Sequence, residues 1–424
     1  MSGEVQRAIE RAGYRGLVSG QWFEKDDSLD YIQVSVVYHD NATCRSCPAP
    51  ARRYSCPGAR RVTRFRWGIF GTGAISAKFV AGLAAARDAE ATFVASRSLA
   101  RAQTFAAGMG IGRAIAGYAA AVADGGVDAI YIATPPSEHA AHALLCIEAG
   151  IPVLIEKPCA SSAAEASRIA AAARSKSVFA MEAMWTRFLP AAQALRDKLA
   201  TREVGEVRLV SGNFGTSQTP DRANGIFNPA LGGGALAHLG AYPLSLAQWL
   251  FGSPTLVQAI GTLGATGVDE DAAFQLQYPA GVIGSFFVSV RAWAPDDFNV
   301  MGTAGMIGVR GSIVRPYGLE VSHETPRRPE EAQFGWKARL RQHGLVHHIA
   351  QRTGRSSRGR GNRLDYRYAG NGYHYEADEV RACVERGAGE SSIMPLNDSI
   401  SVASTTDAIR TAIGSQTAAG KDPQ

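Results

Sequence analysis

The stretch RWGIFGTGAISAKFVAGLAAA, residues 66–86, constrains the fold of this chain more than any other. An apolar run leads into the turn Gly-Thr-Gly, and apolar residues then recur at helical spacing, which predicts a strand, a tight turn and a helix. In such a unit Gly71 permits the turn, and Gly73 lets a pyrophosphate approach the free N–H groups at the helix N-terminus. Ser76, at the third position of this fingerprint, is small enough for close helix–strand contact. A plain strand-to-helix turn has the same pattern, so the context must decide.

Downstream of this turn, apolar segments of strand type alternate with amphipathic segments of helical spacing. Further strands are expected at 92–95, 129–133 and 153–155, and helices at 98–107, 138–149 and 162–174. This alternation indicates a parallel sheet with helices on both faces. We therefore predict an α/β Rossmann dinucleotide-binding domain over residues 63–184, preceded by an extension, residues 1–62, that we expect to be poorly ordered.

The end of the second strand bears on the choice of cofactor. An acidic residue there would hold the ribose 2′-hydroxyl of NAD, but the chain reads Ala-Ser96-Arg97-Ser. A hydroxyl and a guanidinium suit a 2′-phosphate, so NADP is predicted, with NAD as the alternative. Arg97 as a solvated turn residue is the other interpretation.

Two later strands also end in polar groups. Thr134-Pro135 precedes His139, and Glu156-Lys157 follows the next strand. A lysine beside a glutamate is ordinarily a surface ion pair. Because open parallel sheets bind ligands at the carboxyl ends of their strands, these groups are candidates for the cofactor site.

Longer motifs resemble a known family. IYIATPPSEHAAHALLCIEAGIPVLIEKP and MEAMWTRFLPA resemble the glucose-fructose oxidoreductase, inositol dehydrogenase and MocA (Gfo/Idh/MocA) family. The particular likeness is to its dimeric dihydrodiol dehydrogenase and NADP-dependent D-xylose dehydrogenase branch. It runs from about residue 65 to residue 414 and includes GGGALAHLGAYPLSLA and AGNGYHYEADEV. The resemblance implies an NADP-dependent dehydrogenase that acts on the CH–OH group of a sugar, polyol or cyclic diol.

The resemblance also implies a second domain, of α+β class, over residues 185–416. Its open, largely antiparallel sheet would support the substrate pocket and the interface of a homodimer or higher homo-oligomer. The residues agree independently, because β-rich segments predominate after residue 207. Strands are expected at 207–214, 256–263, 272–278, 282–290 and 298–302, and helices at 234–250, 373–385 and 397–412. A basic insertion at about 326–363 and a tail at 417–424 complete the predicted organisation.

The family pattern assigns roles to several residues. Lys157 would reach the cofactor ribose and the substrate hydroxyl. The peptide bond between this lysine and the next residue, Pro158, is commonly cis in the family. Trp185 and Arg187 would lie near the nicotinamide, and Phe214 would line the substrate pocket. The residues expected at the cofactor are Gly71, Thr72, Gly73, Ala74, Ile75, Ser96, Arg97, Thr134, Pro135, His139, Glu156, Lys157, Trp185 and Arg187.

One position departs from the family pattern. His238 occupies the place where an aspartate is expected, and Tyr242 follows four positions on, on the same helical face. An imidazole with an ordinary pKa near 6.5 accepts a proton at neutral pH, whereas tyrosine needs a nearby cation such as Lys157. The predicted mechanism is hydride transfer to the nicotinamide, with Tyr242, slightly favoured, or His238 as base and Lys157 stabilising the oxyanion. His238 as a neutral helix histidine bonded to a backbone carbonyl is the alternative.

Composition limits the remaining possibilities. No apolar run reaches the roughly 18 to 20 residues that cross a bilayer, and no secretory signal is evident, so a cytoplasmic location is expected. Cys44 and Cys47 form a CxxC motif without a clear ligand set, and His343 and His347 lie in a basic segment, so no metal site is predicted.

Two other functions remain open at this stage. A sensor or regulator could keep the nucleotide fold without chemistry, although Lys157 and Tyr242 favour an enzyme. The net charge of +6 could serve nucleic acid, but the excess is concentrated in residues 327–367 and no recognised module accompanies it, so no nucleic-acid or membrane partner is predicted.

Overall fold

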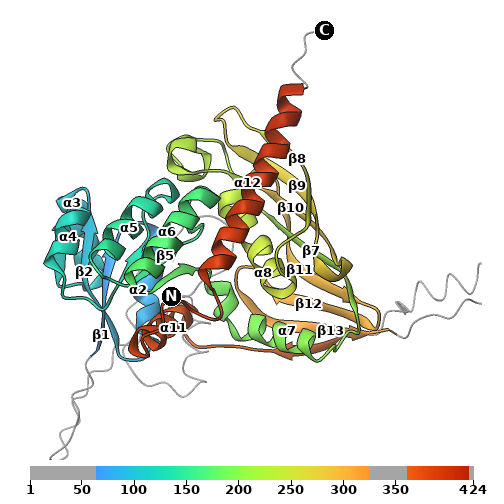
Figure 1. Cartoon of the computed structure of the whole chain (residues 1–424), viewed down its shortest axis with the longest axis horizontal. Coiled ribbons are helices and arrows are strands. Elements are labelled where there is room, and N and C mark those ends of the chain that lie inside the picture. The colour runs from blue at the N-terminus through green and yellow to red at the C-terminus, as the bar shows by residue number, and fades with distance from the viewer. Residues whose placement is uncertain (1–63, 325–360, 420–424) are drawn as a thin grey trace, which may run out of the picture. The chain divides into compact units, whose positions relative to one another are not determined.

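Two β-sheets organise the part of the chain that the computed structural model describes, residues 64–324 and 361–419, with side chains to residue 414 (Figure 1). The predictions for the extension 1–62, including the CxxC motif, lie outside the described residues. So do those for the histidines of the basic insertion and for most of that insertion, 326–363. Among the described helices, none combines the length and apolar character needed to span a membrane.

The first sheet is parallel, with the strand order β3-β2-β1-β4-β5-β6. Its strands are β1 (Phe65–Phe70), β2 (Ala89–Ser96), β3 (Arg113–Ala116), β4 (Ala129–Ile132), β5 (Val153–Glu156) and β6 (Ala180–Ala183). Strands β4, β5 and β6 are buried along their whole length, as expected for a sheet covered on both faces. This is the strand order of dinucleotide-binding sheets, so the predicted Rossmann fold is confirmed.

Helices cover both faces of this sheet. They are α2 (Ala74–Leu83), α3 (Leu99–Met109), α4 (Tyr118–Asp124), α5 (His139–Glu148) and α6 (Ala163–Lys176). Helices α2 and α3 share one apolar core with the sheet, and α4, α5 and α6 share the other. Local signals fix the ends of α6: the Ser162 hydroxyl accepts the Glu165 N–H at the start, and Lys176 lies in the last turn.

The second sheet has eight strands in the order β14-β13-β12-β11-β7-β10-β9-β8. They are β7 (Val207–Gly215), β8 (Leu256–Leu263), β9 (Asp269–Gln277), β10 (Ile283–Ser289), β11 (Ala294–Gly302), β12 (Gly305–Gly311), β13 (Pro316–His323) and β14 (Asn362–Asp365). All pairings except that of β7 with β10 are antiparallel. This confirms the predicted α+β class of the second half.

Helices α7 (Pro190–Ala200) and α8 (Ala241–Phe251) pack against the second sheet, on β13 and β7 respectively. The last two helices connect the two halves: α11 (His374–Glu385) packs on α2, and α12 (Leu396–Ala419) packs on α6, α8 and β8. Figure 1 shows α12 running between the two sheets. It continues past residue 412, where the helix was predicted to end, so that helix end was wrong.

Candidate active site

The turn between β1 and α2 leaves its backbone open to close approach by a ligand. Gly71 has φ +104°, and a Cβ there would lie 2.5 Å from the carbonyl oxygen of Ala133, so only glycine fits. A Cβ on Gly73 would meet nothing within 4 Å. Helix α2 begins at Ala74 without a side-chain cap, which leaves its first N–H groups available to an anion. Ser76 is fully buried, as the third fingerprint position requires. The other predicted turn residues, Thr72 and Ile75, are half-buried.

The end of β2 presents the predicted cofactor-selecting pair. Ser96 is buried and its hydroxyl accepts the N–H of Ser98 at 3.3 Å. Arg97 is exposed, and its positive charge helps to lower the pKa of His142, although burial of that ring is the larger cause. Arg97 directly follows the last residue of β2 and therefore lies at the carboxyl edge of the sheet.

His139 joins the loops that follow β4 and β5. Its Nε2 lies 2.8 Å from the carbonyl oxygen of Thr134, and its Nδ1 lies 2.8 Å from that of Pro158. Burial lowers the pKa of His139 to about 4, while the contacts of its two ring nitrogens with the carbonyl oxygens oppose that shift. The Thr134 hydroxyl lies 3.0 Å from Nδ1 of His142, and Pro135 is half-buried beside it. These contacts hold the two strand-end loops together, and a direct contact of these residues with cofactor stays a prediction.

Glu156, at the end of β5, is held from two sides. The Tyr131 hydroxyl donates to one carboxylate oxygen, and the Lys157 backbone N–H donates to the other at 3.1 Å. Burial raises the pKa of Glu156 against these hydrogen bonds. The peptide bond between Lys157 and Pro158 is cis, as predicted.

The Lys157 ammonium brings the three predicted catalytic residues together. Its Nζ donates to the carbonyl oxygen of His238 at 2.8 Å and lies 4.7 Å from the ring centroid of Tyr242. Burial lowers the pKa of Lys157, while the negative charges of Glu156 and Glu182 oppose that shift. The cation is therefore fixed at the carboxyl edge of the parallel sheet, where the second half of the chain closes over it.

The segment carrying His238 and Tyr242 is not the single α-helix that was predicted. A π-helix, η5 (Leu236–Gly240), carries His238 and leads directly into α8. The Asp269 carboxylate accepts the N–H of Leu236 at 2.6 Å and so caps this helix from β9. Asp269 was missed by the sequence analysis, although three consecutive acidic residues at the start of a strand were a signal.

The two candidate bases have different protonation states. Burial, with help from the Lys157 charge, lowers the pKa of His238 to about 3, and its Nε2 has no partner within the described residues. Burial raises the pKa of Tyr242, and Glu156 adds to the rise. Lys157 lies over the ring face and does not produce the lowered phenol pKa that the sequence argument required. At neutral pH the site therefore holds a neutral phenol and a neutral imidazole.

Aromatic side chains surround Tyr242. The Phe214 ring meets it edge-on at 6.0 Å, and Trp185 stacks on Tyr373 with centroids 4.5 Å apart. The Arg315 guanidinium lies 5.6 Å from the Trp185 ring. Trp185 and Tyr373 are both buried, so the stacked pair forms a rigid aromatic layer.

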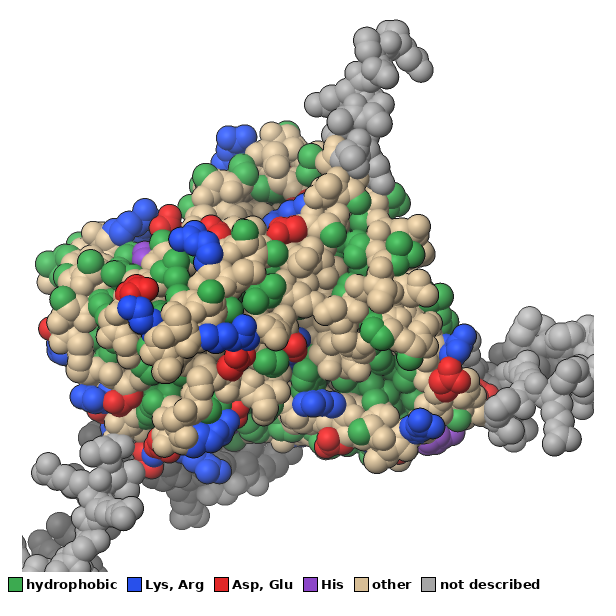
Figure 2. Space-filling model, viewed as in Figure 1, with side chains coloured by type: hydrophobic (Ala, Val, Ile, Leu, Met, Phe, Trp, Pro, Cys, Tyr) green, Lys and Arg blue, Asp and Glu red, His purple; other side chains and the backbone are tan. Residues whose placement is uncertain are grey.

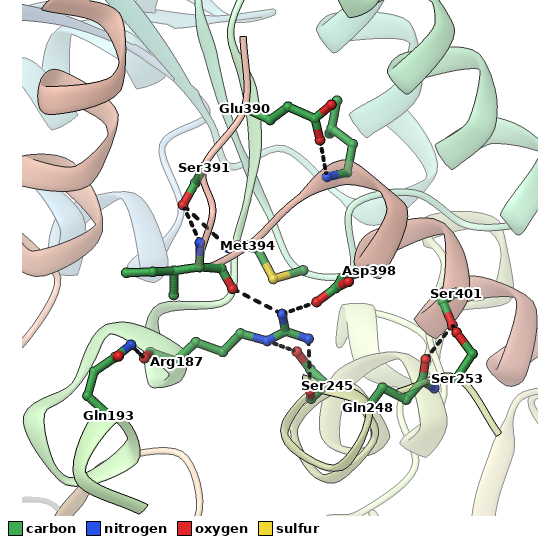
Figure 3. A network of polar contacts seen from close by, with 12 residues as sticks. Arg187, Gln193, Ser245, Gln248, Ser253, Glu390, Ser391, Met394, Asp398 and Ser401 are labelled. Atoms are coloured by element: carbon green, nitrogen blue, oxygen red, sulfur yellow. Dashed lines mark hydrogen bonds and ion pairs between the residues drawn. The ribbon is translucent and has the colours of Figure 1, made fainter. Parts of the chain in front are cut away.

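Arg187 is fully buried and lies in a network of polar contacts (Figure 3). Its guanidinium donates to the hydroxyl and carbonyl of Ser245 at 2.9 and 2.8 Å, to the carbonyl of Ile393 at 3.2 Å and to Asp398 at 2.5 Å. These bonds tie the turn of Trp185 to α8 and to the start of α12. Its predicted contact with the nicotinamide stays a prediction, and the geometry favours an indirect role through Trp185.

Two buried acids complete the surroundings and were not identified from the sequence. Glu182, on β6, accepts the N–H of Cys159 at 2.9 Å. Glu376, in the first turn of α11, is fully buried, and neither of its carboxyl oxygens has a partner among the described residues. A glutamate inside an otherwise apolar four-residue segment was the available signal for Glu182.

The family matches cover both halves of the chain. Residues 65–184 match an oxidoreductase family with an NAD-binding Rossmann fold, and residues 192–308 match the GFO/IDH/MocA C-terminal domain. With the parallel sheet, the glycine turn and the lysine at the sheet edge, these matches define an NAD(P)-binding oxidoreductase. The chain belongs to the glucose-fructose oxidoreductase, inositol dehydrogenase and MocA family, which confirms the resemblance seen in its motifs.

Vertebrate enzymes resemble the chain over most of its length. Trans-1,2-dihydrobenzene-1,2-diol dehydrogenase of Bos taurus is 35% identical over 353 residues, which cover 82% of this chain and 97% of the bovine enzyme. The enzyme of the same name from Homo sapiens is 33% identical over 363 residues, 82% of this chain and 97% of the human one. The prediction of an NAD(P)-dependent dehydrogenase is confirmed at the level of the family.

Solved structures share the fold. Levoglucosan dehydrogenase, in complex with NADH and levoglucosan, superposes with a TM-score of 0.69 at 19% identity, covering 84% of this chain and 98% of that one. A 3-ketoreductase from Actinomadura kijaniata, in complex with NADP and TDP-benzene, gives 0.67 at 23% identity, covering 83% and 98%. Because one neighbour binds NADH and the other NADP, the fold by itself leaves the choice of nucleotide open.

Proposed function

We propose that this protein is an NADP-dependent dehydrogenase that oxidises a carbinol of a cyclic diol, sugar or polyol. The observation that carries the proposal is the Lys157 ammonium, held between the His238 carbonyl and the Tyr242 ring at the carboxyl edge of the dinucleotide-type sheet. The uncapped start of α2 and the open space at Gly73 fit a pyrophosphate there. The names of the vertebrate relatives support a diol as substrate.

The residues around Lys157 have different roles in the proposed reaction. A bound nicotinamide would supply the hydride acceptor. The ammonium of Lys157 stabilises negative charge that develops on the carbinol oxygen, because it is already oriented and largely shielded from water. The stacked Trp185 and the Phe214 edge hold a ring-shaped substrate against Tyr242.

The proton of the carbinol has two candidate acceptors. Tyr242 faces the Lys157 ammonium but is a neutral phenol, so it can accept the carbinol proton only as it passes its own proton on. The neutral imidazole of His238, whose Nε2 has no partner among the described residues, can accept that proton directly. Replacing each in turn, Tyr242→Phe and His238→Asn, separates them. The base is the residue whose loss lowers kcat by about a hundredfold or more while NADPH still binds.

The decisive experiment is a panel of aldoses, polyols and trans-diols assayed with both NAD and NADP. Reduction of NADP by at least one of these substrates, with a lower rate for NAD, is the expected result. A protein that binds NADPH but turns over no member of the panel would instead be a sensor on the same fold. A preference for NAD would remove the role assigned to Arg97.

We also propose that the protein is a homodimer through the second sheet, whose face opposite the core carries exposed apolar side chains. Phe287 and Ile260 flank Ala273 in one cross-strand row, and Ile260 is 63% exposed. In a second row Ile283 lies beside Leu209, and both are exposed. An apolar face of this kind marks a contact with another protein surface.

Sedimentation velocity of the purified protein tests this interface. A dimer is expected for wild type, and Ile260→Asp, which places a charge on this face, should shift it to monomer. As a matched control, Leu99→Asp changes an exposed leucine of α3, away from the second sheet, and should leave the dimer intact. A wild-type monomer would refute the proposal. The predicted cytoplasmic location stays a prediction.

Acidic and basic side chains are interspersed on the described face drawn in Figure 2. Such a surface offers no continuous basic stripe for a nucleic-acid backbone on that face.

A further inference from the structure

Helix α12 contacts the loop that follows Lys157 with side chains of both charges. The Asp407 carboxylate accepts the N–H of Ala163 at 2.9 Å, and the Arg410 guanidinium donates to the carbonyl oxygen of Ser161 at 3.3 Å. Asp407 and Arg410 are three positions apart, so both lie on the same face of the helix. Ser161 is only four residues beyond Lys157 in the chain. The last helix of the protein therefore holds the end of the loop that carries this lysine.

The same guanidinium also reaches the second sheet. Its Nε lies 3.8 Å from a carboxylate oxygen of Asp269, the first residue of β9. Asp269 is only 5% exposed, and burial raises the pKa of its carboxyl, whereas the Leu236 N–H and the charge of Arg410 oppose that rise. Arg410 thus places a positive charge next to an acid that has little contact with water.

Asp269 in turn holds the helix that carries His238. One of its carboxylate oxygens accepts the N–H of Leu236, the first residue of η5, at 2.6 Å. A Cβ on Gly234 would overlap the Asp269 carboxylate, so glycine at this position lets the acid approach the start of the helix. The carbonyl oxygen of His238, two residues further along η5, accepts a hydrogen bond from the Lys157 ammonium at 2.8 Å.

These contacts form a closed circuit with two arms. One arm runs from Lys157 along its loop to Ser161. The other runs from His238 back along η5 to Asp269. The hydrogen bond from the lysine to the His238 carbonyl joins the two arms at one end, and Arg410 joins them at the other. Without Arg410, either arm can move without the other, and the distance between the ammonium and η5 is no longer fixed from both ends.

We propose that Arg410 is a positioning residue, which holds the Lys157 ammonium at a fixed distance from η5 and α8. The inference rests on the proposed function, because that function gives the ammonium a task in hydride transfer. It goes beyond that function by assigning a role to a residue of the last helix that acts through the groups it contacts. Because a misplacement of about 1 Å can lower a rate about a hundredfold, the loss of this link should appear in kcat.

The first test needs neither substrate nor cofactor. The purified full-length protein is treated briefly with an amine-acetylating reagent at a fixed pH, and the modification rates of Lys157 and Lys198 are measured by mass spectrometry. Lys198, on α7, pairs with Glu203 and serves as the internal reference. In Arg410→Met the rate at Lys157 should rise several-fold relative to this reference, because the ammonium leaves its carbonyl partner more often.

Arg174→Met is the matched control. Arg174, in the last turn of α6, also joins the nucleotide-binding half to the C-terminal part of the chain, through Glu390 and Asn397 at 3.0 Å each. It lies outside the circuit that includes Lys157. Both variants should lower the melting temperature, but only Arg410→Met should raise the rate of Lys157 modification. A purely structural role for Arg410 would leave this rate the same in the two variants.

A double-mutant cycle tests whether Arg410 acts through Asp269. Asp269→Asn keeps an acceptor for the Leu236 N–H but removes the charge, and it should raise the rate of Lys157 modification in the same way. The double variant should show no further rise beyond the larger single effect, since both changes break the same link. Arg410→Lys retains a cation and should restore part of the wild-type behaviour. Asp269→Asn also keeps the test decisive if Arg410→Met does not fold.

The second test uses a substrate found with the panel described above. Arg410→Met should lower kcat by about tenfold or more and leave the affinity for NADPH nearly unchanged. An unchanged rate of Lys157 modification in both single variants, fully additive effects in the double variant, or an unchanged kcat would each overturn the proposal. A wild-type protein that turns over no substrate would refute the proposed function, whereas the labelling result would still decide whether Arg410 positions Lys157.

Discussion

Replacing Glu376 by glutamine is expected to stabilise the protein at neutral pH. The side chain has no exposed surface, and neither carboxyl oxygen has a partner in the part of the chain that the structure describes. Burial, and then the charge of Glu156, raise the pKa of Glu376 well above its ordinary value of 4.5. The folded protein therefore holds a proton at this carboxyl that the unfolded chain releases at neutral pH.

This difference in proton binding makes stability depend on pH. At or below pH 4.5 the carboxyl is protonated in most of the unfolded chain as well, and the folded state loses little. As the pH rises from 4.5 toward the raised pKa of the folded state, the free energy of unfolding falls by up to about 1.4 kcal/mol per pH unit. Glutamine has nearly the same shape but does not ionise, so Glu376→Gln should lack this loss.

Urea unfolding followed by fluorescence at pH 5, 6, 7 and 8 measures the effect. The stability of Glu376→Gln minus that of wild type should grow with each step in pH. The control is Glu385→Gln on the same helix, because Glu385 is exposed and pairs with Arg381. The difference in free energy of unfolding between Glu385→Gln and wild type should stay nearly constant over this pH range. A Glu376→Gln difference that is also constant, or that shrinks as the pH rises, would refute a neutral buried carboxyl.

Three further outcomes are expected. Arg187→Leu should lower the free energy of unfolding by about 3–5 kcal/mol in thermal or urea denaturation, because it leaves a partly buried carboxylate without its cation. Gly71→Ala should fail to fold stably, since its Cβ would lie 2.5 Å from the Ala133 oxygen, whereas Gly73→Ala should fold normally yet bind NADPH at least about tenfold more weakly by fluorescence titration. Arg97→Ala should weaken NADPH binding by about tenfold and leave NADH binding unchanged; equal losses for both nucleotides would contradict its role.

Short sequence patterns predicted the strands and helices that depend mainly on neighbouring residues. The strand at 256–263 was predicted at the bounds the structure gives, and the glycine turn fixed the first helix. The short strands β3 and β6 were missed because RAIA and AMEA each place a charged residue in a segment of four. Helix α7 was also missed, although a proline at its first position is a helix-start signal.

Residues of the site could be predicted only where they belong to a recognisable sequence motif. Lys157, His238 and Tyr242 come from recognisable motifs, and the structure brings them together. Asp269 and Glu376 act on the same site from a distant strand and a distant helix, and no spacing in the sequence links them to it. The protonation states were also beyond prediction, because burial sets the pKa of His238 and Tyr242.

The packing of α12 on α6 has a consequence for biosynthesis. The Arg187 network and the Arg410 contact join this helix to residues made more than two hundred positions earlier. The nucleotide-binding half therefore leaves the ribosome with an uncovered flank, which is closed only when the final helix emerges. Deleting that helix would damage the first half of the protein as much as the second, and a fragment that stops at the end of the parallel sheet would expose apolar surface to chaperones.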